Sequence, residues 1–369
     1  MYQNQKQFSG NLHALRGIAA LMVLFYHAMA MPQTLDVGAL SFVGTFGLGV
    51  TLFFILSGFS LSLSNYDKID EANWLRGYSI KRMARILPVW WAFVTLTLVY
   101  HYFKYGVLHS PAEMLYNYTV TYSLVPGRHE SFVWAGWTIG VEMMFYAIFP
   151  LLIVTIRDNI KGWLFLTLAF LGISVAMRAY ANGAIPNSYM DISFPRRGFI
   201  FILGCLLYFI TRRANKQGWS NIWGWNCGAL GLISLMYWAL AVIGKMPLSG
   251  DWSHFATALW VGFLTVFFYI NPKIGDRHWF NIYNPFTRFL GDKSYTIYLA
   301  HPIMVEETRR FYPSIKNTVK HTELSFIVYC LLVMALTFIV ATLISRYIEA
   351  PLYKRGRALA SKPLPRTNT

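Results

Sequence analysis

Long apolar runs recur along this chain and are separated by short polar connections. Several of the runs reach the roughly 20 residues that a helix needs to cross the hydrocarbon core of a bilayer. A helix on the surface of a soluble domain would instead show one apolar stripe and one polar face. The pattern therefore predicts ten membrane-spanning helices, at residues 12–30, 42–64, 86–103, 138–156, 162–181, 197–211, 226–244, 254–271, 294–308 and 324–346.

The composition supports this interpretation. Of the 369 residues, 56% are hydrophobic and 13% are charged, whereas a soluble domain has roughly twice that charged fraction. We predict an all-α fold, a polytopic transmembrane helical bundle of about ten spans. Residues 1–357 would form one integral membrane domain in the lipid bilayer, and residues 358–369 a basic, disordered cytoplasmic tail.

Basic residues outnumber acidic residues by 32 to 16, which gives a net charge of +16. Because the bases flank membrane spans, the positive-inside rule is their first explanation, and it puts both termini in the cytoplasm. Binding of a polyanionic small molecule or of anionic lipid is the second explanation, and we expect no nucleic acid partner. The bases on the cytoplasmic side include Lys68, Arg76, Lys81, Arg82, Arg157, Lys161, Arg212, Arg213, Lys216, Lys273, Arg277, Arg288, Lys293, Lys354, Arg355 and Arg357.

The segment 110–136 does not fit the pattern of full spans. Its apolar part, Met114–Val125, is too short for an ordinary span, and we interpret it as a re-entrant or interfacial element. If it crossed the membrane, every later connection would change sides and the basic tail would face outward. That outcome conflicts with the charge distribution.

No disulfide or metal site is expected. Metal ligands and disulfides need particular spacings of cysteine and histidine, and neither the three cysteines nor the histidines of the connections show them. These residues are Cys205, Cys227, Cys330, His101, His109 and His129.

An arginine and a histidine lie within the first predicted span. Arg16 and His27 are separated by almost three helical turns, so they share one face at depths that differ by roughly 16 Å. A charge and an imidazole inside a bilayer are costly and by default mark a pathway or a reaction site. The alternative is that Arg16 extends to the interface and His27 hydrogen-bonds to a neighbouring helix.

Two further arginines lie at the cytoplasmic end of the third predicted span. Arg82 and Arg85 are three residues apart and share a helix face. Two guanidinium groups there could clamp phosphate groups through bidentate hydrogen bonds. The alternative is that they are ordinary membrane-flanking bases.

Glu142 is the one carboxylate placed well inside an apolar run, and Thr138 precedes it by one helical turn on the same face. A carboxylate in lipid must be protonated or paired. Glu142 could pair with an arginine, orient His27 as a carboxylate orients a catalytic imidazole, or form a structural ion pair between helices.

A fourth run, Gly291-Asp-Lys-Ser294-Tyr295-Thr-Ile-Tyr298-Leu-Ala-His301-Pro302, offers hydroxyl groups and a second intramembrane histidine. The position of His301 before a proline favours packing or hydrogen bonding at a kink over a reactive role. The glycines of Gly44-Thr-Phe-Gly47-Leu-Gly49 are not a dinucleotide-binding motif, because no strand precedes them, and close helix packing explains them better.

Taken in order, these motifs closely resemble those of the membrane-bound acyltransferase family 3, and the resemblance covers almost the whole chain. The single motifs are loose, but the ordered set is specific. The matching residues are Arg16 and His27, Phe53-Phe-Ile-Leu-Ser57-Gly58-Phe59, Arg82-Met-Ala-Arg85-Ile-Leu-Pro88, Trp137-Thr138 with Glu142 and Tyr146, Ser294-Tyr295 with His301, and Ile348-Glu349-Ala-Pro351.

The resemblance implies a bacterial inner-membrane enzyme that transfers acetyl or another short acyl group from cytoplasmic acyl-coenzyme A to a hydroxyl group of a surface or secreted glycan. It implies no permanently bound cofactor, since acyl-coenzyme A is a donor substrate. Arg16, Arg82 and Arg85 would bind its phosphates. The resemblance also implies that His27 is essential and that Arg16 accompanies it. Our own hypothesis is that His27 acts as the general base on the acceptor hydroxyl and that Glu142 orients it. An acyl-histidine intermediate is the alternative route.

The same motifs assign acceptor binding to Trp137, Thr138, Tyr295 and His301. Trp134 and Trp137 could stack on sugars or belong to the aromatic belt of the membrane interface. Exopolysaccharide, lipopolysaccharide O-antigen, enterobacterial-type common antigen and a secreted oligosaccharide all fit as acceptors. A proton-coupled transporter or flippase is the main alternative function, because intramembrane Arg, His and Glu also build proton relays. An inactive, receptor-like relative is a third.

Overall fold

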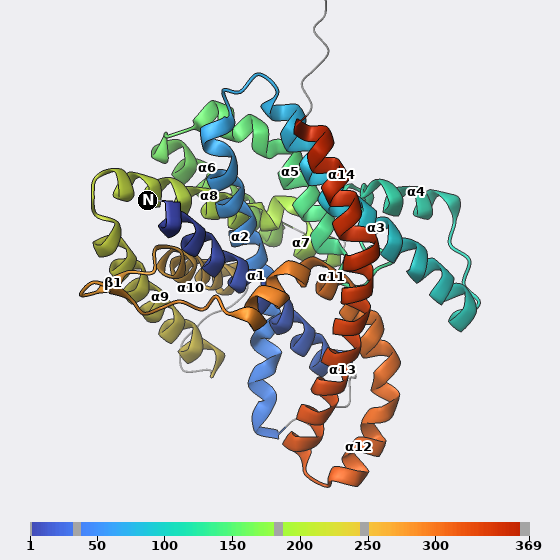
Figure 1. Cartoon of the computed structure of the whole chain (residues 1–369). Coiled ribbons are helices and arrows are strands. Elements are labelled where there is room, and N and C mark those ends of the chain that lie inside the picture. The colour runs from blue at the N-terminus through green and yellow to red at the C-terminus, as the bar shows by residue number, and fades with distance from the viewer. Residues whose placement is uncertain (1, 32–37, 181–186, 244–250, 362–369) are drawn as a thin grey trace, which may run out of the picture. The chain divides into compact units, whose positions relative to one another are not determined.

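The computed structural model describes residues 2–31, 38–180, 187–243 and 251–361 (Figure 1). Most of these residues lie in helices, and the sheet structure within these ranges is one antiparallel hairpin, β1 (Lys273–Ile274) paired with β2 (Arg277–His278). The expected all-α architecture is confirmed. The chain folds as two compact units, which alternate along the sequence and are each described by themselves.

Unit 1 consists of Met1–Leu63 and Ile156–Ser294. Its elements are α1 (Tyr2–Ala30), the 3₁₀ helix η1 (Gly38–Leu48), most of α2 (Gly49–Asn65), α6 (Ile160–Tyr180), α7 (Asn187–Ile192), α8 (Phe194–Lys216), α9 (Ser220–Val242), α10 (Asp251–Ile270), the hairpin, and the first part of α11 (Pro285–Thr308).

Glycines let the helices of unit 1 approach closely. A Cβ atom at Gly58 of α2 would overlap the backbone carbonyl of Phe201 in α8, and one at Gly204 of α8 would overlap the carbonyl of Ile55. Small residues at helix contacts are typical of membrane bundles. The glycine of the Phe53–Phe59 motif is therefore explained by packing.

Unit 2 consists of Ser64–Thr155 and Tyr295–Thr369. Its elements are η2 (Tyr66–Lys68), α3 (Trp74–Tyr105), α4 (Pro111–Thr119), η3 (Tyr122–Leu124), α5 (Trp137–Ile156), the rest of α11, η4 (Arg309–Phe311), α12 (Tyr312–Val319), α13 (Thr322–Ile344), the π-helical turn η5 (Ser345–Glu349) and α14 (Ala350–Ser361).

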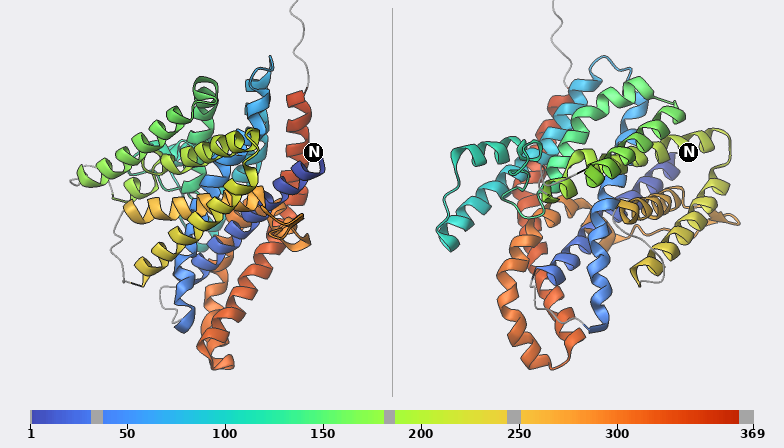
Figure 2. Two further views of the ribbon diagram at one scale, coloured as in Figure 1. Left: turned by 90° about the vertical axis from the view of Figure 1, so that its left-hand side faces the viewer. Right: turned by 180° about the vertical axis from the view of Figure 1, so that it is seen from behind.

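In unit 2, the C-terminal helix α14 lies along the first half of α3 (Figure 1). The two backbones can approach closely because residue 356 of α14 is a glycine. A Cβ atom at this position would overlap the side chain of Ala84 in α3. The end of α11 and the helix α13 run side by side and are linked by α12 (Figure 2). There the Tyr329 hydroxyl donates a 3.3 Å hydrogen bond to the carbonyl of Val305.

Eight helices of the described chain are long and apolar enough, by length and composition, to cross a membrane, as expected of a multi-pass membrane protein. They cover eight of the ten predicted spans. The spans predicted at 226–244 and 294–308 lie in α9 and α11, helices of 23 and 24 residues that are not among the eight. Residues 181 and 244, the ends of two predicted spans, lie outside the described residues.

The start of the third span differs from the prediction. Helix α3 begins at Trp74 and not near residue 86, because charged residues end an apolar run without ending a helix. Residues 74–85, which were predicted to precede the span, are therefore the first turns of α3. Arg82 and Arg85 lie inside the helix, more than two turns from its start.

The segment 110–136 contains no long helix. It folds into α4, of nine residues, and the single turn η3, both too short to span a bilayer. Helix α4 has a full capping box, in which the Ser110 hydroxyl accepts from the Glu113 N–H and the Glu113 carboxylate accepts from the Ser110 N–H. At the other end of the chain α14 extends to Ser361, so the first residues of the predicted tail are helical. The rest of that tail, 362–369, lies outside the described residues.

Candidate active site

A cavity of about 690 Å³ lies in unit 2 where the first turns of α3 meet the end of α2, η2 and α14. We call it the basic cavity, because four bases and one carboxylate line it. Aromatic and amide side chains complete its wall. The lining residues are Ser64, Asn65, Lys68, Glu71, Ala72, Asn73, Trp74, Gly77, Tyr78, Lys81, Arg82, Tyr353, Arg357, Ala360 and Ser361.

The four bases of this cavity, Lys68, Lys81, Arg82 and Arg357, have no acidic partner among the described residues, since none of them forms an ion pair with a carboxylate. The buried Nε of Arg82 has no hydrogen-bond partner there either. A buried donor that stays unpaired is costly. The cavity therefore has the charge and the unused donors of a site for an anion.

Arg82 is connected to Glu142 through a tyrosine. Its guanidinium carbon lies 5.6 Å from the ring centre of Tyr146, and the Tyr146 hydroxyl donates a hydrogen bond to the Glu142 carboxylate. The hydroxyl of Tyr78, in the cavity wall, donates a 2.9 Å hydrogen bond to the carbonyl of Tyr146. Glu142 thus has a polar partner one helical turn away, which satisfies part of the requirement of a carboxylate in an apolar helix.

Arg85 has a different environment from Arg82. Its guanidinium carbon lies 5.8 Å from the ring centre of Tyr353 in α14, and Arg85 is not among the residues that line the basic cavity. The predicted clamp of two arginines on one helix face does not appear in the cavity wall. Arg82 lines the cavity directly, whereas Arg85 contacts it only through Tyr353, whose ring lies against Arg85 and also lines the cavity.

Arg16 and His27 both belong to α1 of unit 1, and both are half-buried. Near the start of this helix, His13 Nε2 lies 2.9 Å from the Asp292 carboxylate. The buried Asn11 side chain donates to the Phe268 carbonyl and accepts from the Ile282 N–H. These contacts fix α1 within unit 1. The predicted pairing of Glu142 with His27 joins residues of different units and stays a prediction.

Thr138 and His301 lie in one interior cluster of unit 2. The Thr138 hydroxyl lies 2.9 Å from the Tyr298 hydroxyl, and the Tyr298 ring meets the His301 ring edge to face with centres 5.6 Å apart. His301 is fully buried and its Nδ1 lies 3.2 Å from the Ile297 carbonyl. His301 is therefore a buried residue that packs against Tyr298, and its role stays a prediction.

The other two predicted acceptor-binding residues lie elsewhere in unit 2. The Tyr295 hydroxyl donates a 3.1 Å hydrogen bond to the carbonyl of Ile86 in α3. Trp137 is the first residue of α5 and is half-buried. Neither they nor Thr138 nor His301 line the basic cavity. Their assignment to the acceptor stays a prediction.

Sequence reasoning missed three of the four bases of the cavity as site residues. Lys68, Lys81 and Arg357 were explained as determinants of membrane orientation. Their positive charge was visible in the sequence. The sequence did not show that α14 packs on α3 and thereby brings Arg357 to the cavity. Glu349 is a second omission, since this buried carboxylate accepts a 2.6 Å hydrogen bond from Thr296 at the π-helical turn, a distortion frequent at functional sites.

Comparison with known proteins gives one family and several relatives. A family model described as an acyltransferase domain matches residues 9–346. The protein named "Putative O-acetyltransferase SACOL0978" from Staphylococcus aureus (strain COL) is 25% identical over 98% of this chain and 60% of its own length. The peptidoglycan O-acetyltransferase OatA of Listeria monocytogenes is 23% identical over 95% of this chain and 57% of its own length.

The chain therefore spans about 60% of the length of these curated relatives. A shorter relative from Acidianus two-tailed virus, named "Putative acetyltransferase ORF330", is 26% identical over 82% of this chain and 85% of its own length. No solved structure matches the chain.

Proposed function

The chain belongs to the acyltransferase domain family, and from this premise we propose that it is an O-acyltransferase. It moves an acyl group, most simply acetyl, from acyl-coenzyme A to a hydroxyl group of a glycan. The names of the staphylococcal and listerial relatives support O-acetyl transfer, and the listerial name supports a carbohydrate polymer as acceptor. The basic cavity is the observation that supports the donor.

Coenzyme A is a polyanion with a long, flexible thioester arm. Its phosphates require several positive charges, of which arginine is the type suited to planar, bidentate contacts. The basic cavity offers Arg82 and Arg357 with two lysines, and its volume of about 690 Å³ lies within the roughly 300–1,000 Å³ of small-molecule sites. Arg85 acts indirectly in this scheme, through Tyr353, and Arg16 stays a candidate for a separate phosphate contact.

We assign the general base to His27. In the transfer step its neutral imidazole takes the proton of the acceptor hydroxyl as the oxygen attacks the thioester carbonyl. A C–O bond forms, the C–S bond breaks, and the proton passes to the departing thiolate of coenzyme A. An imidazole has one nitrogen that can accept a proton and can release it again, so a single residue can serve both proton transfers. The acyl-histidine route differs in that the imidazole nitrogen itself attacks the thioester.

The basic cavity opens at the cytoplasmic face in this proposal, because acyl-coenzyme A is a cytoplasmic metabolite and because the positive-inside rule places both termini there. The protein then resides in a bacterial cytoplasmic membrane with the first turns of α3 on the inner side. A cysteine introduced at Ser361 should react with a membrane-impermeant maleimide in inside-out vesicles and not in right-side-out vesicles.

The decisive experiment measures acetyl-coenzyme A binding and turnover by the purified full-length chain, in wild type, Arg82→Gln and Arg76→Gln forms. Arg76 lies on the same helix but does not line the cavity, so it controls for loss of charge alone. Arg82→Gln should raise the donor Kd and KM about tenfold or more, since losing a hydrogen bond to a charged group costs about 1.5–3 kcal/mol, with a smaller change in kcat.

If wild type neither binds coenzyme A nor turns over the thioester, the acyltransferase proposal fails and a transport function takes its place. If Arg82→Gln and Arg76→Gln have equal effects, the cavity is not the donor site.

A further inference from the structure

Unit 2 contains a second cavity at the other end of α3, with a volume of about 290 Å³. We call it the aromatic cavity. The last turns of α3, the loop before α5, and the junction of α11 with η4 form its wall. Its lining residues include Thr97, His101, Tyr105, Trp134, Glu306 and Arg309.

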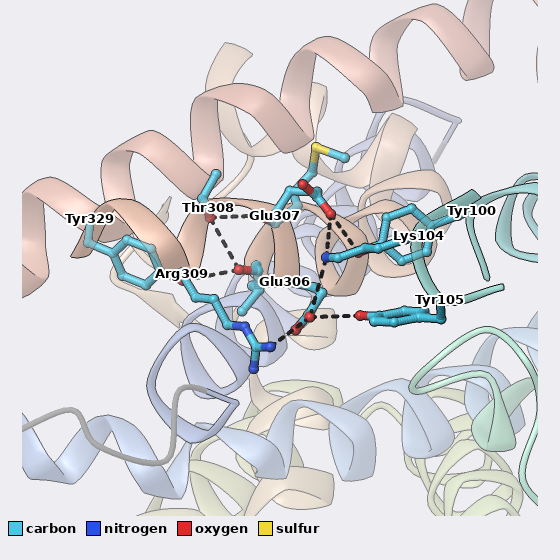
Figure 3. Close-up of polar contacts among 10 residues, drawn as sticks. Tyr100, Lys104, Tyr105, Glu306, Glu307, Thr308, Arg309 and Tyr329 are labelled. Atoms are coloured by element: carbon cyan, nitrogen blue, oxygen red, sulfur yellow. Dashed lines mark hydrogen bonds and ion pairs between the residues drawn. The ribbon is translucent and has the colours of Figure 1, made fainter. Parts of the chain in front are cut away.

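Hydrogen bonds and ion pairs hold the charged side of this wall in place (Figure 3). Glu306 accepts from the Tyr105 hydroxyl at 3.0 Å and pairs with the Arg309 guanidinium at 2.9 Å. Lys104 pairs with Glu307 at 2.7 Å and lies 3.5 Å from Glu306. Because these charges compensate one another, the wall presents polar atoms without the excess of positive charge found in the basic cavity.

An exposed tryptophan and a buried threonine complete the wall. The Trp134 side chain is 54% exposed, so one part of its ring system is available to a ligand. Thr97 is 3% exposed and its hydroxyl has no hydrogen-bond partner among the described residues. Buried hydroxyls are nearly always hydrogen-bonded, so a polar group that enters the cavity would relieve a cost that the free protein bears.

We infer that the aromatic cavity binds one sugar ring of the acceptor, an inference that rests on the proposed O-acyl transfer to a glycan. A pyranose has apolar C–H faces, which pack on rings such as that of Trp134. Its rim of hydroxyl groups can each donate and accept, and the wall supplies an acceptor in Glu306 and a donor in Arg309. A cavity of about 290 Å³ is at the small end of ligand sites, which suits a single ring better than a longer stretch of polymer.

Other ligand classes fit the wall less well. A phosphate group would lie beside the Glu306 carboxylate, which repels it and already compensates the charge of Arg309. An acyl chain would have to cover the polar atoms of Thr97, Glu306 and Arg309 without hydrogen-bonding them, which costs free energy for each.

The two cavities are separated by about the thickness of a membrane. Arg82 in the first and His101 in the second lie on the same helix, roughly 28 Å apart along its axis. The hydrocarbon core of a bilayer is about 30 Å thick. If the donor site faces the cytoplasm, the aromatic cavity therefore lies at the opposite face, where a surface or secreted glycan would be available.

Saturation-transfer NMR tests the inference without requiring catalysis. The purified chain in nanodiscs is mixed with methyl β-glucopyranoside, methyl β-galactopyranoside and methyl N-acetyl-β-glucosaminide. Wild type should transfer saturation to the ring protons of at least one of them. Trp134→Ala should abolish the transfer and Glu306→Gln should reduce it severalfold. Trp219→Ala removes a tryptophan of comparable exposure, 60%, away from the cavity and should have no effect.

The outcomes separate this inference from the proposed function. The inference is wrong if no glycoside receives saturation from wild type, or if Trp134→Ala keeps the wild-type signal while coenzyme A binding is intact. Coenzyme A binding by every variant shows that the chain is folded, because the donor cavity shares no lining residue with the aromatic cavity. If Trp134→Ala loses both coenzyme A binding and saturation transfer while Glu306→Gln keeps coenzyme A binding, the Trp134→Ala variant is misfolded. The saturation transfer of Glu306→Gln then tests the inference.

Discussion

The two cavities of unit 2 differ in the state of their charges. The basic cavity has four bases that form no ion pair with a described carboxylate, whereas the aromatic cavity has an arginine and a carboxylate paired with each other. Both lie on α3, and both have one buried polar atom without a described hydrogen-bond partner, on Arg82 and Thr97.

Under the proposed function, this difference explains how one helix can serve two substrates of opposite character. Unpaired bases attract a polyanion from a distance, because the field of several like charges extends through solvent. Compensated charges with exposed aromatic surface recognise a neutral molecule only at contact. In the proposed function, the length of α3 between the two cavities keeps the donor and the acceptor sugar apart until the reacting groups meet.

The largest expected effect is a loss of acyl transfer without a loss of ligand binding. His27→Ala should lower acyl transfer by about 100-fold or more, the contribution of a general base, while both cavities keep their ligands because His27 lies in unit 1 and lines neither. Transfer is measured with radiolabelled acetyl-coenzyme A, and coenzyme A binding in parallel. His254→Ala, another histidine of unit 1, is the matched control. Residual transfer above one tenth of the wild-type rate would exclude His27 as the base.

An intermediate effect compares the two cavities directly. Raising the ionic strength from 0.01 to 1 M shortens the Debye length from about 30 to about 3 Å. Coenzyme A affinity should then fall about tenfold or more, since four unpaired bases are screened, whereas glycoside binding should change by less than about twofold. Titrations of the same preparation with each ligand measure both. Equal salt dependence of the two ligands would contradict the distinction between the cavities.

The smallest effect concerns a single hydroxyl group. Thr97→Val keeps the shape of the side chain and removes an oxygen that has no described partner, so thermal stability should stay equal or rise slightly. Glycoside affinity should fall about two- to tenfold, the value of one neutral hydrogen bond of roughly 0.5–1.5 kcal/mol. Thr95→Val, on the same helix with its hydroxyl bonded to the Trp91 carbonyl, is the control. An unchanged glycoside affinity would remove Thr97 from the site.

Some features of this protein could be predicted from its sequence because they are local. Apolar runs define membrane helices whatever surrounds them, since backbone groups in lipid must be bonded within the helix. The alignment of Arg16 with His27 likewise follows from helix geometry alone. The start of α3 was misplaced for a related reason, because an apolar pattern marks where the membrane begins and not where the hydrogen-bonded helix begins.

The cavities could not be predicted in this way, because residues distant in the sequence form them. Glycine at 356 lets α14 approach Ala84, and that packing places Arg357 and Tyr353 in the wall of the cavity that Arg82 also lines. Sequence spacing placed Arg82 and Arg85 on one helix face. In the structure Arg82 contacts Tyr146 of α5, and Arg85 contacts Tyr353 of α14. The sequence by itself determined a membrane bundle with an arginine and a histidine in its first helix. Tertiary packing decided which charges stay unpaired, since that depends on the partners that close packing brings within reach.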